Sequence, residues 1–270
     1  MFMDTEKLYE LLEIPEYAAE KLRQCRSMFR LEDVEPYLAG MMIPNTAAKA
    51  YRDLKTVLRD DVGGFKMLLC QLECAGRCHA LYHAKGIPER IFVDTMKCFR
   101  RFLRECENRT GEIHFDRGWW TYRQISMCLF RIGELEYELC QTETEKTVSV
   151  HIPSDAVFRA ENVDESLRQA ERFIERYYPD YRQAKRVCSS WLLSPALGKL
   201  LPTQSNILDF QRRFEIIEVY AEDREFMEWI FDAPKDAELS GLPESTSLQR
   251  AAKRLLQEGG SIGAAYGIMK

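Results

Sequence analysis

The sequence predicts an α+β protein, in which a helical N-terminal domain is followed by a mixed β-sheet flanked by helices. Apolar residues recur at helical spacing through roughly the first 110 residues, without an alternating stretch among them. After Gly111 short alternating stretches are separated by helical ones, in the order strand, strand, helix, strand, helix, strand, helix, strand. This change places the boundary near Thr110–Arg117 and predicts domains of residues 1–113 and 114–270.

The N-terminal helices are indicated by capping residues and prolines as well as by apolar spacing. Asp4 is placed to cap the first helix, and Pro15 suits the first turn of the next. A longer apolar helix is expected from about Phe65 to His83. Pro88 is expected to open a single last helix that ends near Asn108.

Five strands are expected in the C-terminal domain, the first two from alternation of apolar and polar residues and the third as a buried strand. These are Glu134–Cys140, Thr147–Ile152, Val187–Leu193, Glu215–Tyr220 and Ala264–Met269. The polar link at 141–146 makes the first two an antiparallel hairpin. Helices are expected between the strands, over about 164–178, 197–214 and 247–258.

The composition is that of a globular protein, with 46% hydrophobic and 30% charged residues among 270. A net charge of -5 gives no basic excess, so neither nucleic acid nor an anionic membrane is an expected partner. The N-terminus, beginning at Met1, has no signal-peptide pattern, and no apolar run has the length of a membrane helix. Nine scattered cysteines fit a reducing compartment, so a cytoplasmic location is expected.

Several segments of the second half resemble one known family. In chain order they are Gly118-Trp-Trp120, Phe130-Arg-Ile-Gly-Glu-Leu-Glu-Tyr-Glu138, His151-Ile-Pro153 with Asp164-Glu-Ser166, Ser190-Trp-Leu-Leu-Ser-Pro195, Leu200-Leu-Pro202, Ser205-Asn-Ile207 with Phe210-Gln211 and Phe214, and Ser245-Thr-Ser-Leu-Gln249. Together they resemble the GNAT-like C-terminal domain of bacterial acyltransferase-domain proteins. That family carries a helical domain before it, and residues 1–113 look like one.

The resemblance implies a GNAT-like N-acyltransferase. Such an enzyme moves an acyl group from acetyl-CoA or another acyl-CoA thioester to an amine, without a covalent enzyme intermediate and without a metal. The expected acceptor is a small molecule, in a site that the helical domain covers. The resemblance also implies that two neighbouring parallel strands, here Thr147–Ile152 and Val187–Leu193, splay apart to admit the acyl-pantetheine arm.

The phosphate loop departs from the usual family pattern. Residues 154–165 contain no glycine and four acidic residues, whereas close backbone approach to a pyrophosphate normally requires glycine. Arg159 and Arg168 are the residues that could offset the acidic charge. The family usually has a tyrosine near the thiol at the end of the helix after Asn206, where it can donate a proton. Here the aromatic residues of that stretch are Phe210 and Phe214, and neither can donate a proton. These departures support an alternative function, a non-catalytic small-molecule or peptide binding protein on a degenerate GNAT fold.

Two residues are predicted to be catalytic, His151 and Glu136. His151 ends a strand at the mouth of the expected cleft, where it could act as general base or simply bond to backbone at the strand end. Glu134, Glu136 and Glu138 alternate on one strand. These glutamates form either a solvated strand face or a face from which one carboxylate turns into the cleft. Glu136 is predicted to be that carboxylate.

The predicted donor-binding residues are Ser189, Ser190, Trp191 and Asn206, together with Arg159. The two serines could bond the pantetheine amides or satisfy a neighbouring helix. Trp191 fits either a ligand platform or a core residue, and Asn206 either a ligand contact or part of an ordinary N-cap.

The cysteines offer two further hypotheses. Cys70, Cys74 and Cys78 recur every four residues, which on a helix describes either a buried stripe or part of a soft-metal site, and the buried stripe is the prediction. Cys188 could be a nucleophile only if a histidine lay beside it.

Overall fold

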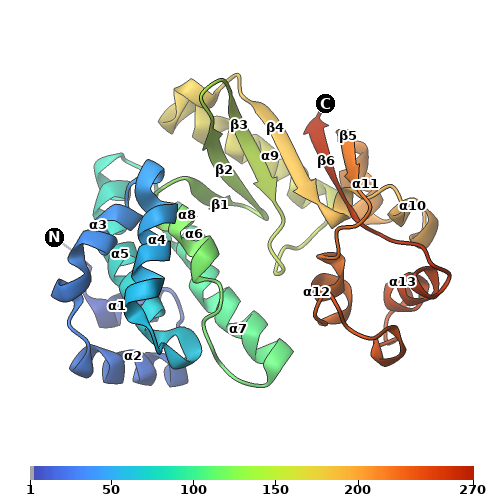
Figure 1. Ribbon diagram of the computed structural model, residues 1–270. Coiled ribbons are helices and arrows are strands. Elements are labelled where there is room, and N and C mark those ends of the chain that lie inside the picture. The colour runs from blue at the N-terminus through green and yellow to red at the C-terminus, as the bar shows by residue number, and fades with distance from the viewer. Residues whose placement is uncertain (1–2) are drawn as a thin grey trace. The chain divides into compact units, whose positions relative to one another are not determined.

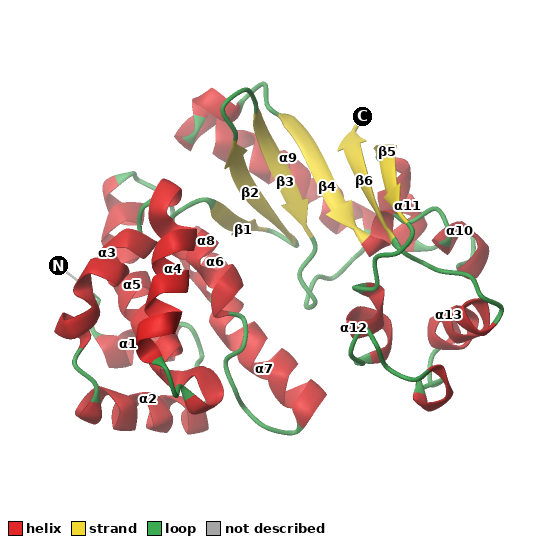
Figure 2. Ribbon diagram, viewed as in Figure 1, coloured by secondary structure: helices red, strands yellow, loops and turns green. Residues whose placement is uncertain are grey.

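The computed structural model describes residues 3–270 and divides into two compact units, Met1–Ile132 and Gly133–Lys270. Met1 and Phe2, part of the stretch on which the signal-peptide prediction rests, lie outside the described residues. Figure 2 shows that helices make up nearly all of the first unit and that the long strands belong to the second. The predicted α+β class is confirmed. The predicted domain limits, 1–113 for the helical domain and 114–270 for the GNAT-like domain, stay a prediction.

The first unit is a set of helices ending in one short strand (Figure 1). Its elements are α1 (Thr5–Leu11), α2 (Glu16–Met28), α3 (Glu35–Met41), α4 (Pro44–Leu58), α5 (Phe65–Ala84), α6 (Glu89–Met96), α7 (Cys98–Thr110), α8 (Gly118–Ile125) and β1 (Leu129–Ile132). The Asp4 carboxylate accepts hydrogen bonds from two backbone N–H groups of α1, as its predicted capping role requires. The prediction of a single helix after Pro88 is wrong, because the helix is interrupted at Lys97 and forms two helices, α6 and α7.

Helix α5 is the centre of the first unit. It is buried on nearly all sides, against α2, α3, α4, α6 and α8. The thiols of Cys70, Cys74 and Cys78 lie in this core, so the predicted buried stripe is confirmed. The buried Gln71 amide donates to the Gly118 carbonyl oxygen at 2.9 Å, which ties α8 to α5 through a satisfied polar group.

The second unit is a mixed sheet with helices. Its elements are β2 (Leu135–Gln141), β3 (Lys146–His151), α9 (Ala160–Tyr177), β4 (Lys185–Ser190), α10 (Leu197–Leu200), α11 (Asn206–Arg212), β5 (Phe214–Tyr220), α12 (Phe226–Phe231), α13 (Ser247–Gln257) and β6 (Ala264–Met269). The strands are ordered β2-β3-β4-β6-β5. β2 and β3 form the predicted antiparallel hairpin, β3 and β4 are parallel, and β6 is antiparallel to both β4 and β5. The parallel pair needs a crossover, and α9 supplies it.

The two faces of this sheet differ in chemistry. Tyr137, Val148 and Val150 are buried on the face that α9 covers. There Ser166 of α9 lies 2.9 Å from the Tyr137 hydroxyl, and its Oγ accepts from the Leu135 N–H at 3.2 Å. Because successive side chains alternate, the opposite face carries the polar residues of β2 and β3.

The strand predicted over Val187–Leu193 is shorter than expected. It ends at Ser190, whose hydroxyl accepts from the Leu192 N–H at 3.1 Å and caps a 3₁₀ turn at Trp191–Leu193. Trp191 therefore does not lie on the strand. It packs against an apolar cluster built mainly from α10, α12 and α13.

Candidate functional site

The parallel strands β3 and β4 separate toward their carboxyl ends. Their register pairs Thr147 with Lys185, Val148 with Arg186 and Ser149 with Val187. Both strands continue past the last of these pairs, β3 to His151 and β4 to Ser190. Figure 1 shows the two strands running side by side at their beginnings and diverging at their ends. Beyond Ser149 and Val187 the two strands are not paired with each other. This is the arrangement expected for admitting an extended ligand between them.

His151 lies at this diverging end and has a carboxylate partner. Its Nε2 is 2.9 Å from Oε2 of Glu138, with 23% and 19% of the two side chains exposed. The β2–β3 register places Glu138 opposite Ser149, so the imidazole reaches diagonally to the neighbouring pair. A carboxylate on one ring nitrogen holds an imidazole in a fixed orientation, as a general base requires.

The glutamates of β2 do not form a solvated face. Glu136 is only 2% exposed and lies directly opposite His151 in the register. Glu134 precedes the strand and accepts a hydrogen bond from the Val157 N–H at 2.7 Å. The sequence placed Glu136 in the site and considered Glu138 only as one of three alternatives. Alternation showed that the two share a face, but the contact of Glu138 with His151 depends on the strand register.

The predicted donor-binding residues of β4 separate in the structure. Ser189 is exposed, and by alternation from the Ser149–Val187 pair it shares the sheet face of His151. Ser190 points to the other face, where its hydroxyl is used by the turn. Trp191 belongs with the apolar cluster, as the core interpretation predicted.

Asn206 and Arg159 both lie at helix starts. Asn206 is exposed at the first position of α11, and Ser205 caps that helix by accepting from the Ile207 N–H at 3.2 Å. Arg159 is exposed at the N-cap position of α9 and makes no side-chain cap. The first backbone N–H groups of this 18-residue helix are therefore not bonded by the N-cap side chain.

The connection between β3 and α9 is ordered without glycine. The Phe158 ring packs on the buried Phe210 ring at 5.0 Å between centroids, which attaches the connection to α11. The Asn162 side chain also donates to the Val157 carbonyl at 3.1 Å. The turn is thus held by side-chain contacts where the usual family pattern would have flexible glycines.

Several of the family-like motifs stabilise this unit. Gln211 of α11 donates to the Ser194 carbonyl at 2.7 Å, and the Ser194 hydroxyl donates to the carbonyl of Ile262. Thr246 and Gln249 form a capping box at the start of α13, and Gln249 also donates to the Ile230 carbonyl at 2.9 Å. These residues connect the helices to the sheet and to each other.

Cys188 does not have the properties of a nucleophile. It is fully buried, and burial raises the pKa of its thiol to about 12, so the reactive thiolate is not formed near neutral pH. Across residues 3–270 no group of three or more histidine, cysteine or acidic side chains is arranged to hold a metal ion. Nor does any helix there have the length and apolarity needed to cross a bilayer.

Comparison with protein-family models gives two matches that together span almost the whole chain. Residues 129–269 match the GNAT-like C-terminal domain, and residues 3–127 match the N-acyltransferase N-terminal domain. The chain belongs to the family of GNAT-like N-acyltransferases. The resemblance inferred from the sequence motifs is therefore confirmed.

Solved structures support the fold of this GNAT-like protein. An acyltransferase crystallised with decanoyl-CoA and teicoplanin superposes with a TM-score of 0.78 at 21% identity, over 98% of this chain and 87% of that one. The complex of an acyltransferase with CoA and 10C-teicoplanin gives the same values. An acyltransferase with decanoyl-CoA superposes with a TM-score of 0.72 at 20% identity, over 99% of both chains. No curated protein sequence matches the chain.

Proposed function

We propose that the protein transfers an acyl group from an acyl-CoA to the amine of a small-molecule acceptor, with His151 as general base. The observation that carries this proposal is the placement of the His151–Glu138 pair where β3 and β4 diverge. In a chain of this family, these strand ends are where a thioester would be presented to an acceptor.

The donor is proposed to lie along the ends of β3 and β4. Its pantetheine amides would bond the free backbone groups of the diverging strands, with Ser189 beside them. Its pyrophosphate would face the first N–H groups of α9, where the helix dipole favours an anion and Arg159 adds a positive charge. Relatives of the same fold are described with CoA and decanoyl-CoA bound, which supports an acyl-CoA donor.

The chemistry needs one proton to move from the amine to the sulfur. His151 takes a proton from the acceptor nitrogen as that nitrogen attacks the thioester carbonyl carbon. The C–N bond forms, the C–S bond breaks, and the thiolate of CoA leaves with the electron pair. The imidazolium, stabilised by Glu138, then returns the proton to the thiolate. Glu136, buried directly opposite His151 in the register, is proposed to act together with this pair.

The acceptor is proposed to be a small molecule rather than a protein, a nucleic acid or a membrane. Two relatives of this fold are described in complex with teicoplanin or its 10C derivative, a small-molecule class of ligand. We propose a cytoplasmic location, because all nine cysteines are free thiols and most are buried.

Thermal unfolding with CoA, acetyl-CoA and decanoyl-CoA tests the donor, and release of free thiol in the presence of amines tests the reaction. A ligand at 100 times its Kd adds about 2.7 kcal/mol to stability, enough to raise Tm by several degrees. His151→Ala should keep the shift in Tm and lose thiol release by 10²-fold or more. If no thioester raises Tm at millimolar concentration, the proposal is contradicted. That result would favour the alternative of a non-catalytic binding protein, which the glycine-free connection 152–159 also supports.

A further inference from the structure

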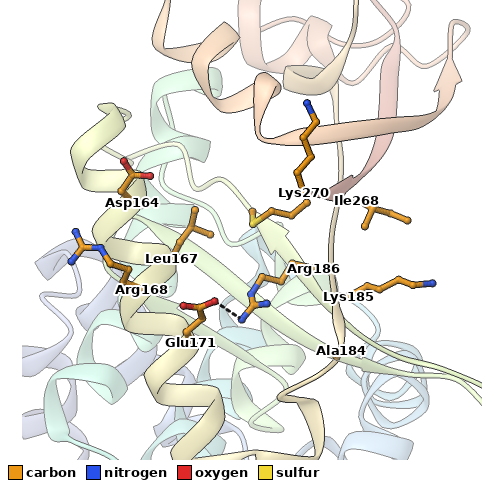
Figure 3. Close-up of a pocket in the computed structure, with 10 residues that line it drawn as sticks. Asp164, Leu167, Arg168, Glu171, Ala184, Lys185, Arg186, Ile268 and Lys270 are labelled. Atoms are coloured by element: carbon orange, nitrogen blue, oxygen red, sulfur yellow. Dashed lines mark ion pairs between the residues drawn. The ribbon is translucent and has the colours of Figure 1, made fainter.

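We propose that the pocket between α9 and the beginning of β4 binds a small phosphate monoester, at a site separate from the acyl-transfer residues. The pocket has a volume of about 550 Å³ and lies wholly within the second unit. That volume is in the range of small-molecule sites, roughly 300–1,000 Å³. Figure 3 shows its walls, with the α9 side chains on one side and those of β4 and β6 on the other.

Cations outnumber carboxylates in the lining. The charged residues are Arg168, Lys185, Arg186 and Lys270, against Asp164 and Glu171. Lys185 shares the sheet face of Val187 and Ser189, so the cations on the α9 side are Arg168, Arg186 and Lys270. Three positive groups beside one hollow favour an anion with more than one negative charge. A phosphate monoester carries about two at neutral pH, with three acceptor oxygens.

Arg186 is the anchor of the proposed site. It extends from β4 toward Glu171 of α9, and its guanidinium lies 3.2 Å from that carboxylate (Figure 3). Arg186 is only 24% exposed, whereas Glu171 is 61% exposed. An exposed partner holds a guanidinium weakly, while phosphate oxygens can match its planar donors in pairs. A phosphate can therefore replace Glu171, which would turn into solvent.

Arg168 is also available to a ligand at small cost. It pairs with Glu165 at 2.5 Å, and both side chains are more than 40% exposed. An exposed pair of this kind contributes little to stability, so Arg168 can turn toward a ligand. The Asp164 carboxylate is already neutralised by Arg213, which limits its repulsion of an anion.

Apolar side chains complete the pocket. Leu167 of α9, Ala184 before β4 and Met269 of β6 line it between the charged groups. An inorganic ion would leave this surface unused, whereas a phosphate on an organic body covers it. The lining thus favours a phosphate ester over free phosphate.

The site is distinct from the acyl-transfer residues in position and in face. Arg186 precedes Ser190 by four residues, about 13 Å along an extended strand. It pairs with Val148, before the strands diverge. It also faces α9, whereas His151 and Ser189 are on the opposite face of the sheet.

Calorimetric titration of the full chain with adenosine 5′-monophosphate tests the proposal, with adenosine and inorganic phosphate as comparison probes. We expect the monophosphate to bind with 1:1 stoichiometry, inorganic phosphate to bind at least tenfold more weakly, and adenosine not to bind. Arg186→Gln and Arg168→Gln should each weaken binding of the monophosphate at least tenfold. Arg182→Gln serves as the matched control, because this exposed arginine pairs with Glu175 outside the pocket.

Two results would overturn the inference. One is the absence of monophosphate binding at 10 mM, or binding that both Arg186→Gln and Arg168→Gln leave unchanged. If Arg186→Gln does not fold, the exposed Arg168 decides alone. The other is competitive displacement of the monophosphate by 3′-dephospho-CoA, which carries no phosphate monoester, since this would assign the pocket to the donor and not to a separate site.

Discussion

His151 Nε2 lies 2.9 Å from the Glu138 carboxylate, although the hairpin register places Glu136, not Glu138, directly opposite the histidine. The imidazole therefore leans along β3 toward the preceding residue pair. This orientation engages Nε2 with the carboxylate. It also gives the two glutamates different environments, one buried and one in contact with the histidine.

Glu138→Gln is expected to lower the rate of acyl transfer about tenfold or more, with little change in donor binding. The amide cannot stabilise the imidazolium, so His151 becomes a poorer base while the fold is kept. Thiol-release kinetics would reveal the loss in kcat. The control is Glu143→Gln in the exposed hairpin turn, which should behave as wild type. An unchanged rate in Glu138→Gln excludes a role of this contact in catalysis.

Ser166→Ala is expected to destabilise the protein by about 1–3 kcal/mol. The substitution removes the partner of the buried Tyr137 hydroxyl and of the Leu135 N–H, and leaving a buried polar group unpaired costs about this much. Denaturant unfolding measures the loss. Tyr137→Phe should cost less, since the Ser166 Oγ keeps its bond to Leu135. Equal losses in the two variants would contradict the assignment of Ser166 to both partners.

The Glu35–Arg77 pair is expected to make stability depend on acid pH. Hydrogen bonds at 2.6 and 2.9 Å from the Arg77 guanidinium hold the pKa of Glu35 below its ordinary value. A carboxyl whose pKa is lowered by folding adds stability above the pKa of its unfolded form, roughly 4.3, and loses it as pH falls through the folded pKa. Wild type should therefore exceed Glu35→Gln in free energy of unfolding at pH 7, and the two should converge on acidification. A difference that stays constant with pH would refute this linkage.

Cys188 is expected to resist alkylation in the folded protein. Its thiol pKa is raised to about 12 by burial, against roughly 8.5 in an unfolded chain. Because folding favours the neutral thiol, this group destabilises the folded state as pH rises above the unfolded value. Labelling with iodoacetamide at pH 8, read by mass spectrometry, should modify the partly exposed Cys140 first and Cys188 only after unfolding in denaturant. Early modification of Cys188 would show that the strand opens locally.

Local patterns in the sequence were enough to predict much of the second unit. Alternation gave the β2–β3 hairpin, and the helical stretch that follows it predicted the crossover to β4. The short elements α8, β1 and α12 were missed, because segments of 4 to 8 residues hold too few periods to separate helix from strand. The site roles predicted for Glu136, His151, Ser189, Ser190, Trp191, Asn206 and Arg159 stay predictions.

The sequence alone determined the family, the α+β class and the chain order of the strands, because these depend on local spacing and on motifs that need no partner. Only the tertiary structure decided which glutamate meets His151, where β4 ends, and that Arg168, Arg186 and Met269 line one pocket. Those features depend on strand register and on contacts between residues 13 to 101 positions apart. A shift of one residue in register reverses every side chain of a strand, and no local pattern specifies that shift.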